Sequence, residues 1–99
     1  MVVGTLRCDL LLGDVHSLKQ KRGVVRPIVA ELRRRFEVSA AETGEHDLYR
    51  RAEVSVALVT DDHAHAARVL EGCERLIAGR PEVDVLSTRT RVLDDDDLN

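Results

Sequence analysis

Residues 52–78 read AEVSVALVTDDHAHAARVLEGCERLIA, and in this stretch a strand pattern leads directly into a helix pattern. Val54, Val56 and Leu58 alternate with polar or small side chains, which is typical of a strand with one buried face. After residue 61 the apolar side chains recur every three or four residues, as they do along one side of an α-helix. The stretch therefore predicts a strand over residues 52–60 that is followed at once by a helix.

The ends of this helix are marked by residues that favour helix termini. Asp61 or Asp62 supplies the N-cap, and Gly79 followed by Pro81 ends the helix at about Ala78. One buried stripe is predicted, made of Ala66, Leu70, Cys73 and Ile77.

The N-terminal part of the chain repeats this order of strand and helix. Residues 2–12 alternate and predict a strand, and Ser17 is the expected N-cap of a helix that runs to about residue 36. Pro27 lies inside that helix, where proline removes a backbone hydrogen bond and clashes with the preceding turn, so we expect a kink near residues 23–27. A separate helix that starts at Pro27 is the alternative. The expected buried stripe is Leu18, Val25, Val29, Leu32 and Phe36, with Ile28 beside it.

Two shorter patterns complete the chain. Residues 37–43 and 82–92 each predict a strand, and residues 44–51 predict a polar connection with a helical turn around residues 47–50. The order β-α-β-β-α-β predicts an α+β fold, a ferredoxin-like sandwich with a four-stranded antiparallel sheet and two helices on one face. We expect one such domain over residues 1–93 and a disordered acidic tail over residues 94–99.

The sheet face that points away from the helices is predicted to be small and moderately apolar. Such a face either meets solvent or forms the contact of a structural or regulatory homodimer. Its expected residues are Val3, Thr5, Arg7, Ser39, Ala41, Ser55, Ala57 and Val59.

Charge is divided unevenly along the chain, although the formal net charge is only −3. Residues 17–36 hold seven basic side chains and one acid, whereas residues 37–62 hold seven acids and two basic side chains. Four cations of the first helix fall within one narrow arc, which predicts contact with nucleic-acid phosphates, with a solvated helix flank as the alternative. The strands at 2–12 and 52–60 carry no aromatic side chain, so we expect no base stacking. The four cations are Lys19, Arg22, Arg26 and Arg33.

Topology brings several polar residues to one end of the predicted domain. Among them, His46 and Asp47 allow a third hypothesis, a small enzyme with an acid–base pair, against the simpler explanation of an exposed histidine. The acidic tail is expected at the opposite end, with Arg33, Arg34 and Arg35 as one possible set of partners. The loop set consists of His16, Glu42, His46, Asp47, Arg50 and Arg51, with Lys19, Arg22 and Arg80 nearby.

No catalytic, metal-binding or cofactor motif stands out in the sequence. Cys8 and Cys73 are isolated thiols on apolar faces, so buried structural cysteines are expected in place of a disulfide or a metal site. No apolar run approaches the length of a membrane span and no secretory leader is visible, so we expect a cytoplasmic protein without membrane contact. These observations favour a binding module that is not an enzyme and needs no cofactor.

Two segments resemble the YlxP-like family of small bacterial proteins of unknown function. They are HSLKQKR at residues 16–22 and AETGEHDLYRRA at residues 41–52, and the resemblance extends over essentially residues 1–93. It implies a ferredoxin-like fold, in agreement with the pattern of strands and helices. The family is often found alongside translation and ribosome-maturation factors, which implies RNA or the ribosome as a partner. The resemblance implies no catalytic residues.

Overall fold

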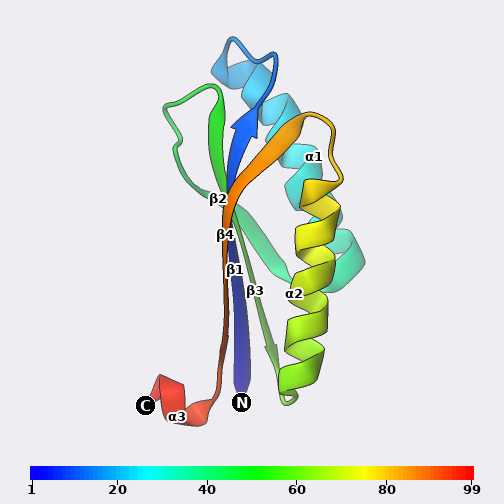
Figure 1. Cartoon of the computed structure of the whole chain (residues 1–99), viewed down its shortest axis with the longest axis vertical. Helices are drawn as coiled ribbons and strands as arrows, with labels where there is room; N and C mark the ends of the chain where they lie inside the picture. The colour runs from blue at the N-terminus through cyan, green and yellow to red at the C-terminus, as the bar shows by residue number, and fades with distance from the viewer.

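The computed structural model describes residues 1–99 and contains the strands and helices in the predicted order. The elements are β1 (Val2–Leu12), α1 (Leu18–Phe36), β2 (Ser39–Gly44), β3 (Arg51–Thr60), α2 (His63–Ala78), β4 (Val83–Leu93) and the short α3 (Asp95–Leu98). The strands form one antiparallel sheet in the order β2-β3-β1-β4. Both long helices lie on the same side of this sheet (Figure 1). The predicted α+β, ferredoxin-like arrangement is therefore confirmed.

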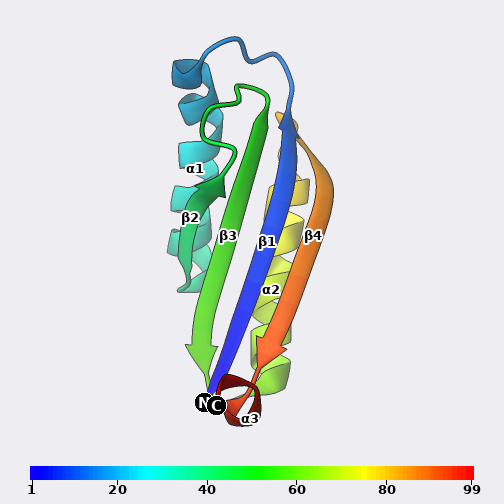
Figure 2. The same cartoon turned by 90° about the vertical axis from the view of Figure 1, so that its left-hand side faces the viewer.

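The molecule is a thin slab in which one face of the sheet is covered and the other is bare (Figure 2). Its principal extents are 44 × 24 × 18 Å. We call the sheet face under α1 and α2 the inner face, and the opposite one the outer face. Both chain ends lie at one end of the slab, and the connections β1–α1 and β2–β3 lie at the other (Figure 2). We call that second end, with residues 13–17 and 45–50, the loop end.

Aliphatic side chains fill the core between the inner face and the two helices. Alternate residues of β1 point inward, and Leu6, Leu10 and Leu12 are each at most 1% exposed. Burial of one such side chain stabilises the fold by about 1.5–3 kcal/mol. Because many aliphatic side chains are buried, the core is formed without a fully buried aromatic residue. The predicted stripe of α2 is confirmed, because each of its residues is buried: Ala66, Leu70, Cys73 and Ile77.

α1 is one continuous helix that passes through Pro27, so the alternative of a separate helix starting there is wrong. Ser17 caps the helix as predicted, and its Oγ accepts a hydrogen bond from the backbone N–H of Gln20 at 3.1 Å. Leu18 is wrongly predicted as buried, since the first turn of α1 lies at the loop end and leaves it 40% exposed. The inward position of that turn is taken by Lys21, which is only 2% exposed. The rest of the central stripe is buried as predicted: Val25, Ile28, Val29 and Leu32.

Two boundaries differ from the prediction because single residues adopt left-handed backbone conformations. Glu37 has a φ of 49° and ends α1, so β2 begins at Ser39 and not at residue 37. Glu45, with a φ of 62°, turns the chain directly after the end of β2. Residues 46–50 accordingly form turns and bends in place of the expected helical turn.

The acidic tail contains one helical turn, where its composition predicts disorder. Asp94 caps α3 by accepting hydrogen bonds from the backbone N–H groups of Asp97 and Asp96 at 3.2 and 2.9 Å. These bonds lower the pKa of the Asp94 carboxyl group. The helical turn is thus explained by the capping hydrogen bonds of Asp94. A prediction from the acidic composition alone does not take such bonds into account.

The contacts of the tail also differ from the expected ones. The α-amino group of Met1 lies 2.9 Å from Asp95, and His63 of α2 lies 3.7 Å from Asp94. The tail therefore packs against the N-terminus of the chain and the start of α2. The expected contact with the basic run is not formed, because those residues pair elsewhere: Arg33, Arg34 and Arg35.

Candidate nucleic-acid interface

The basic side chains of α1 fall into those that have partners inside the molecule and those that have none. Lys19, Arg22 and Arg26 belong to the second group, because they are exposed and form no ion pair. They follow one another at spacings of three and four residues, which places them along one side of the helix. We call these three residues the basic flank. They are the part of the predicted phosphate contact that no other group of the protein occupies.

Arg33, the fourth predicted cation, is held at the edge of the sheet. Its Nε and Nη2 both donate to the backbone oxygen of Ala40 in β2, at 3.0 and 2.6 Å. The side chain remains exposed, but its guanidinium group has a fixed position between α1 and the edge strand. Arg33 therefore differs from the residues of the basic flank, because its guanidinium group has a partner within the protein.

Lys21 is a residue of this region whose role the sequence analysis did not identify, because it entered only the count of basic side chains in residues 17–36. Its Nζ lies 2.9 Å from Oε2 of Glu42 in β2 and donates to the backbone oxygens of Glu45 and Leu48 at 2.6 and 2.9 Å. One buried ammonium group thus fastens the β2–β3 connection to α1. The available signal was its spacing, because Lys21 lies one helical turn before the buried Val25.

Glu31 binds the remaining basic residues of this surface. Arg80, in the link between α2 and β4, pairs with its carboxylate, and Arg34 and Arg35 lie 3.7 and 3.4 Å from Oε1. Arg80 is therefore found beside the middle of α1 and not with the loop residues, because the two helices pack side by side. The only acid of α1 is fully engaged by these three partners.

Two arginines of the predicted loop set hold the loop end together. Arg50 donates from Nε to the backbone oxygens of Leu12 and Gly13 at 3.0 and 3.1 Å, which ties the end of β1 to the start of β3. Arg51 donates to Asp9 at 2.7 Å, and this hydrogen bond raises the pKa of the guanidinium group. Topology brings these residues to one end as expected, and their contacts are structural.

The histidines of the loop set do not meet. His16 contacts Asp14 at 2.7 Å on the surface. His46 and Asp47 are exposed in the β2–β3 connection and make no hydrogen bond to each other. The acid–base pair that the sequence allows is not assembled in this structure.

The two cysteines are buried in the core, as expected, and both are free thiols. Burial raises the pKa of Cys8 to about 12 and that of Cys73 to about 11, which suppresses the reactive thiolate form. No group of three or more histidine, cysteine or acidic side chains lies close enough to share a metal ion. None of the helices has the length and apolar character that crossing a membrane requires.

Comparison with known proteins supports the fold and the resemblance. A family model described as protein of unknown function (DUF503) matches residues 3–90. The chain is 29% identical over 89 residues to the uncharacterized protein YlxP of Bacillus subtilis (strain 168), and the match covers 90% of this chain and 97% of that protein. A solved structure, the de novo designed protein Foldit4, has a TM-score of 0.56 at 16% identity and covers 96% of this chain and 99% of its own. At that identity the likeness shows the fold alone.

Proposed function

Because the chain belongs to the DUF503 family of proteins of unknown function, we propose a function from its own residues. The chain is a small binding module that contacts the phosphate backbone of RNA through the basic flank of α1. The observation that supports this proposal is that Lys19, Arg22 and Arg26 are exposed and unpaired on one side of a helix whose other cations are engaged. The context implied by the family resemblance, translation and ribosome maturation, points in the same direction.

The geometry of the basic flank suits a row of phosphates. Arg26 lies seven positions after Lys19, which corresponds to about 10 Å along the helix. Arginine offers a planar fork of N–H donors that matches two phosphate oxygens, and lysine adds a mobile point charge. Each phosphate that the flank neutralises releases counterions, so the affinity should fall steeply as salt rises.

The negative net charge of the chain does not oppose this contact. Exposed charges more than about 8 Å apart are largely screened at physiological ionic strength, so a bound strand responds to the local surface. On that surface the nearest acid in the helix, Glu31, is already paired with Arg34, Arg35 and Arg80.

The recognition should depend on backbone and shape more than on base sequence. The only aromatic residues are Phe36 and Tyr49, and neither lies in a strand of the sheet. Proteins that read single-stranded RNA on a sheet stack bases on aromatic side chains, which this sheet lacks. The proposal also implies a cytoplasmic protein, since RNA and ribosomes are found there.

The test is a mobility-shift titration of a labelled RNA hairpin with the R22E/R26E variant. The proposal predicts at least about a tenfold loss of affinity at low salt, because two attractive contacts become repulsive. R68E/R75E is the matched control, since Arg68 and Arg75 are exposed and unpaired on α2 and the change in net charge is the same. Equal losses for the two variants, or no loss for R22E/R26E, would reject the basic flank as the contact.

A homodimer through the outer face is the second candidate, and one observation favours it. Val59 is 70% exposed on the outer face near the end that carries the chain termini, beside Val3 of the neighbouring strand. The same face also carries Arg7, Arg89 and Arg91, and a two-fold contact would bring these like charges together. Sedimentation at micromolar concentration separates the candidates, because a strict monomer excludes the dimer.

A further inference from the structure

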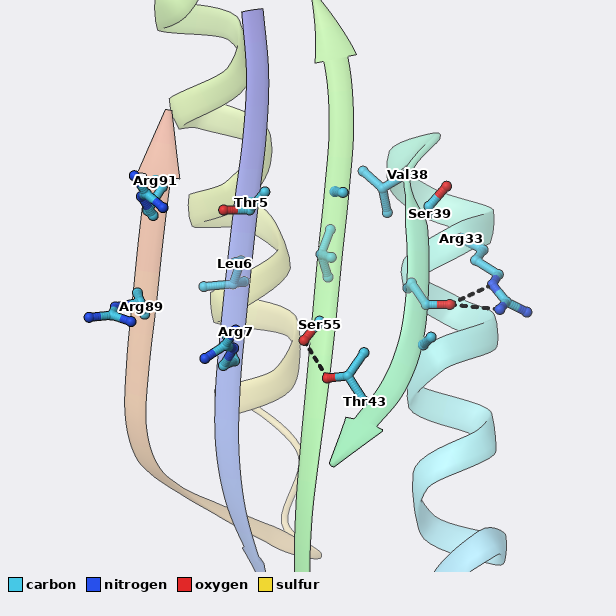
Figure 3. A pocket seen from close by; sticks show the side chains of 14 residues that line it. Thr5, Leu6, Arg7, Arg33, Val38, Ser39, Thr43, Ser55, Arg89 and Arg91 are labelled. Atoms are coloured by element: carbon cyan, nitrogen blue, oxygen red, sulfur yellow. Dashed lines mark hydrogen bonds between the residues drawn. The ribbon is translucent and has the colours of Figure 1, made fainter. Parts of the chain in front are cut away.

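The outer face contains a hollow whose floor is formed by small side chains. Ser39 and Ala41 of β2 and Ser55 and Ala57 of β3 line it, and its volume is about 700 Å³ (Figure 3). On β1 and β4 the corresponding outward positions carry longer side chains, so the sheet is recessed on one half and raised on the other. The sequence did not indicate this hollow, because the predicted list of outer-face residues contained no residue of β4.

Arginines line this hollow, and no carboxylate does. Arg89 and Arg91 project from β4, and Arg7 projects from β1 beside them (Figure 3). Arg7 lies directly opposite Arg89 in the register of the two strands, an arrangement of like charges that destabilises a sheet. Arg89 and Arg91 form no ion pair, and Arg7 has only Glu53, with 3.9 Å between Nε and Oε1. Hydroxyl groups supply the other polar lining. Those of Thr43 and Ser55 are hydrogen-bonded to each other, and Thr43 donates to Glu53, whereas Thr5 and Ser39 make no side-chain hydrogen bond within the protein.

This lining matches a phosphate ligand by its chemistry. Arginine forks and hydroxyl groups are the donors that proteins most often direct at phosphate oxygens. The hollow is shallow and open and has no aromatic residue, so it suits a length of backbone better than an enclosed nucleobase. An anion bound between Arg7, Arg89 and Arg91 would also remove the repulsion between these side chains.

The hollow is connected to α1 around the β2 edge of the sheet. Arg33 borders the outer hollow and also a second hollow of about 470 Å³ between α1 and β2, which is shared with Arg26. Figure 3 shows Arg33 beyond β2, on the opposite side of the hollow from Arg89 and Arg91. Cations therefore follow one another from the basic flank, over the edge strand, to the outer face.

We propose that the outer face is a second phosphate-binding surface, on which an RNA strand continues after it leaves the basic flank of α1. This inference rests on the proposed function and adds the path of the ligand. Acids of β1 and β3 limit the path in the direction of the loop end, since Asp9 is paired with Arg51 and Glu53 accepts a hydrogen bond from Thr43 at 2.6 Å. The strand thus runs across the sheet, from β2 to β4, and not along it toward the loops.

The experiment compares the salt dependence of RNA-hairpin binding for three matched variants. R89Q/R91Q removes the cations of β4, R22Q/R26Q removes those of the basic flank, and R68Q/R75Q is the control on α2. Loss of a phosphate contact lowers the slope of log affinity against log salt by about 1, so R89Q/R91Q should lower it by about 2. All four positions in the first two variants are exposed, and a thermal melt checks that each variant is folded.

The possible outcomes distinguish this inference from the proposed function. Reduced slopes for both R89Q/R91Q and R22Q/R26Q, with the control unchanged, support both. A slope for R89Q/R91Q equal to that of the control overturns the outer-face contact, and a reduced slope for R22Q/R26Q would then leave the proposed function intact. A reduced slope for R89Q/R91Q alone keeps the outer face as a phosphate contact but rejects the basic flank, and with it the path that joins the two. Absence of binding by the unchanged protein overturns both.

Discussion

Lys21 and its neighbour Arg22 are adjacent basic residues with opposite environments. The side chain of Arg22 is exposed, whereas the side chain of Lys21 is 3% exposed and contacts Glu42 and two backbone oxygens. A charge buried in this way is tolerated only because it is paired and hydrogen-bonded. Lys21 therefore belongs to the architecture of the loop end, and only its neighbours are available for a ligand.

Replacement of Lys21 by methionine should destabilise the protein strongly. The change keeps an unbranched side chain of similar length, but it leaves the Glu42 carboxylate without its counter-ion and the oxygens of Glu45 and Leu48 without their donor. Removal of one partner of a buried pair costs about 3–5 kcal/mol, and partial exposure of Glu42 places the expected loss at about 2–3 kcal/mol. Urea denaturation measures the free energy of unfolding.

Lys19→Met is the matched control for this measurement, because Lys19 is exposed and unpaired in the same turn of α1. It should change the free energy of unfolding by no more than about 0.5 kcal/mol. Similar small effects for both substitutions would show that the Lys21 pair does not stabilise the fold.

At the scale of elements, α1 and α2 approach each other closely at one glycine. A Cβ atom built on Gly72 of α2 would lie 2.7 Å from Cε1 of Phe36, at the end of α1. Real contacts of this kind are never so short, so the ring of Phe36 occupies the space that any other residue would need. The glycine is therefore explained by helix packing and not by backbone conformation.

Gly72→Ala should destabilise the protein by about 1 kcal/mol, although alanine is favoured over glycine in a helix by a similar amount. In a Phe36→Ala background the same substitution should instead be stabilising, because the obstructing ring is gone. Thermal unfolding of the two single variants and the double variant measures this reversal of sign. A stabilising effect of Gly72→Ala with Phe36 present would contradict the close contact.

The elements that could be predicted from sequence are those in which the spacing of apolar residues alone defines the buried face. Every inward position of α2 is apolar or alanine, so its stripe at Ala66, Leu70, Cys73 and Ile77 follows from spacing alone. Over residues 88–91 of β4, threonine on the inner face alternates with arginine on the outer face. A register shift between Asp9 and Leu10 of the partner strand changes which residues are paired. The placement of Arg89 and Arg91 on the outer face depends on that pairing, which sequence alone does not give.

Lys21 and the tail were missed for a related reason. The burial of Lys21 depends on the β2–β3 connection, which meets α1 only in the folded chain. The helical turn of the tail depends on the position of one cap, Asp94, within a run of identical residues. The predicted set of loop residues gathers at one end as topology requires, but topology does not determine which side chains pair.

At the scale of the whole molecule, a protein of net charge −3 presents connected cations on two surfaces. The basic flank lies on α1, the arginines of β1 and β4 lie on the outer face, and Arg33 lies between them at the edge of the sheet. The acids nearest to this route, Glu31, Glu42 and Glu53, each contact a basic side chain of the protein. Exposed cations are therefore grouped on particular surfaces of the molecule. The net charge of the whole chain does not reveal this grouping.

Contact between the basic flank and RNA can be observed residue by residue in an NMR titration of the ¹⁵N-labelled protein with a short RNA hairpin. We predict that backbone amide signals of residues 19–26 shift first and most strongly, while those around Arg68 and Arg75 on α2 stay unchanged. Shifts that saturate with RNA but leave residues 19–26 unaffected would contradict it.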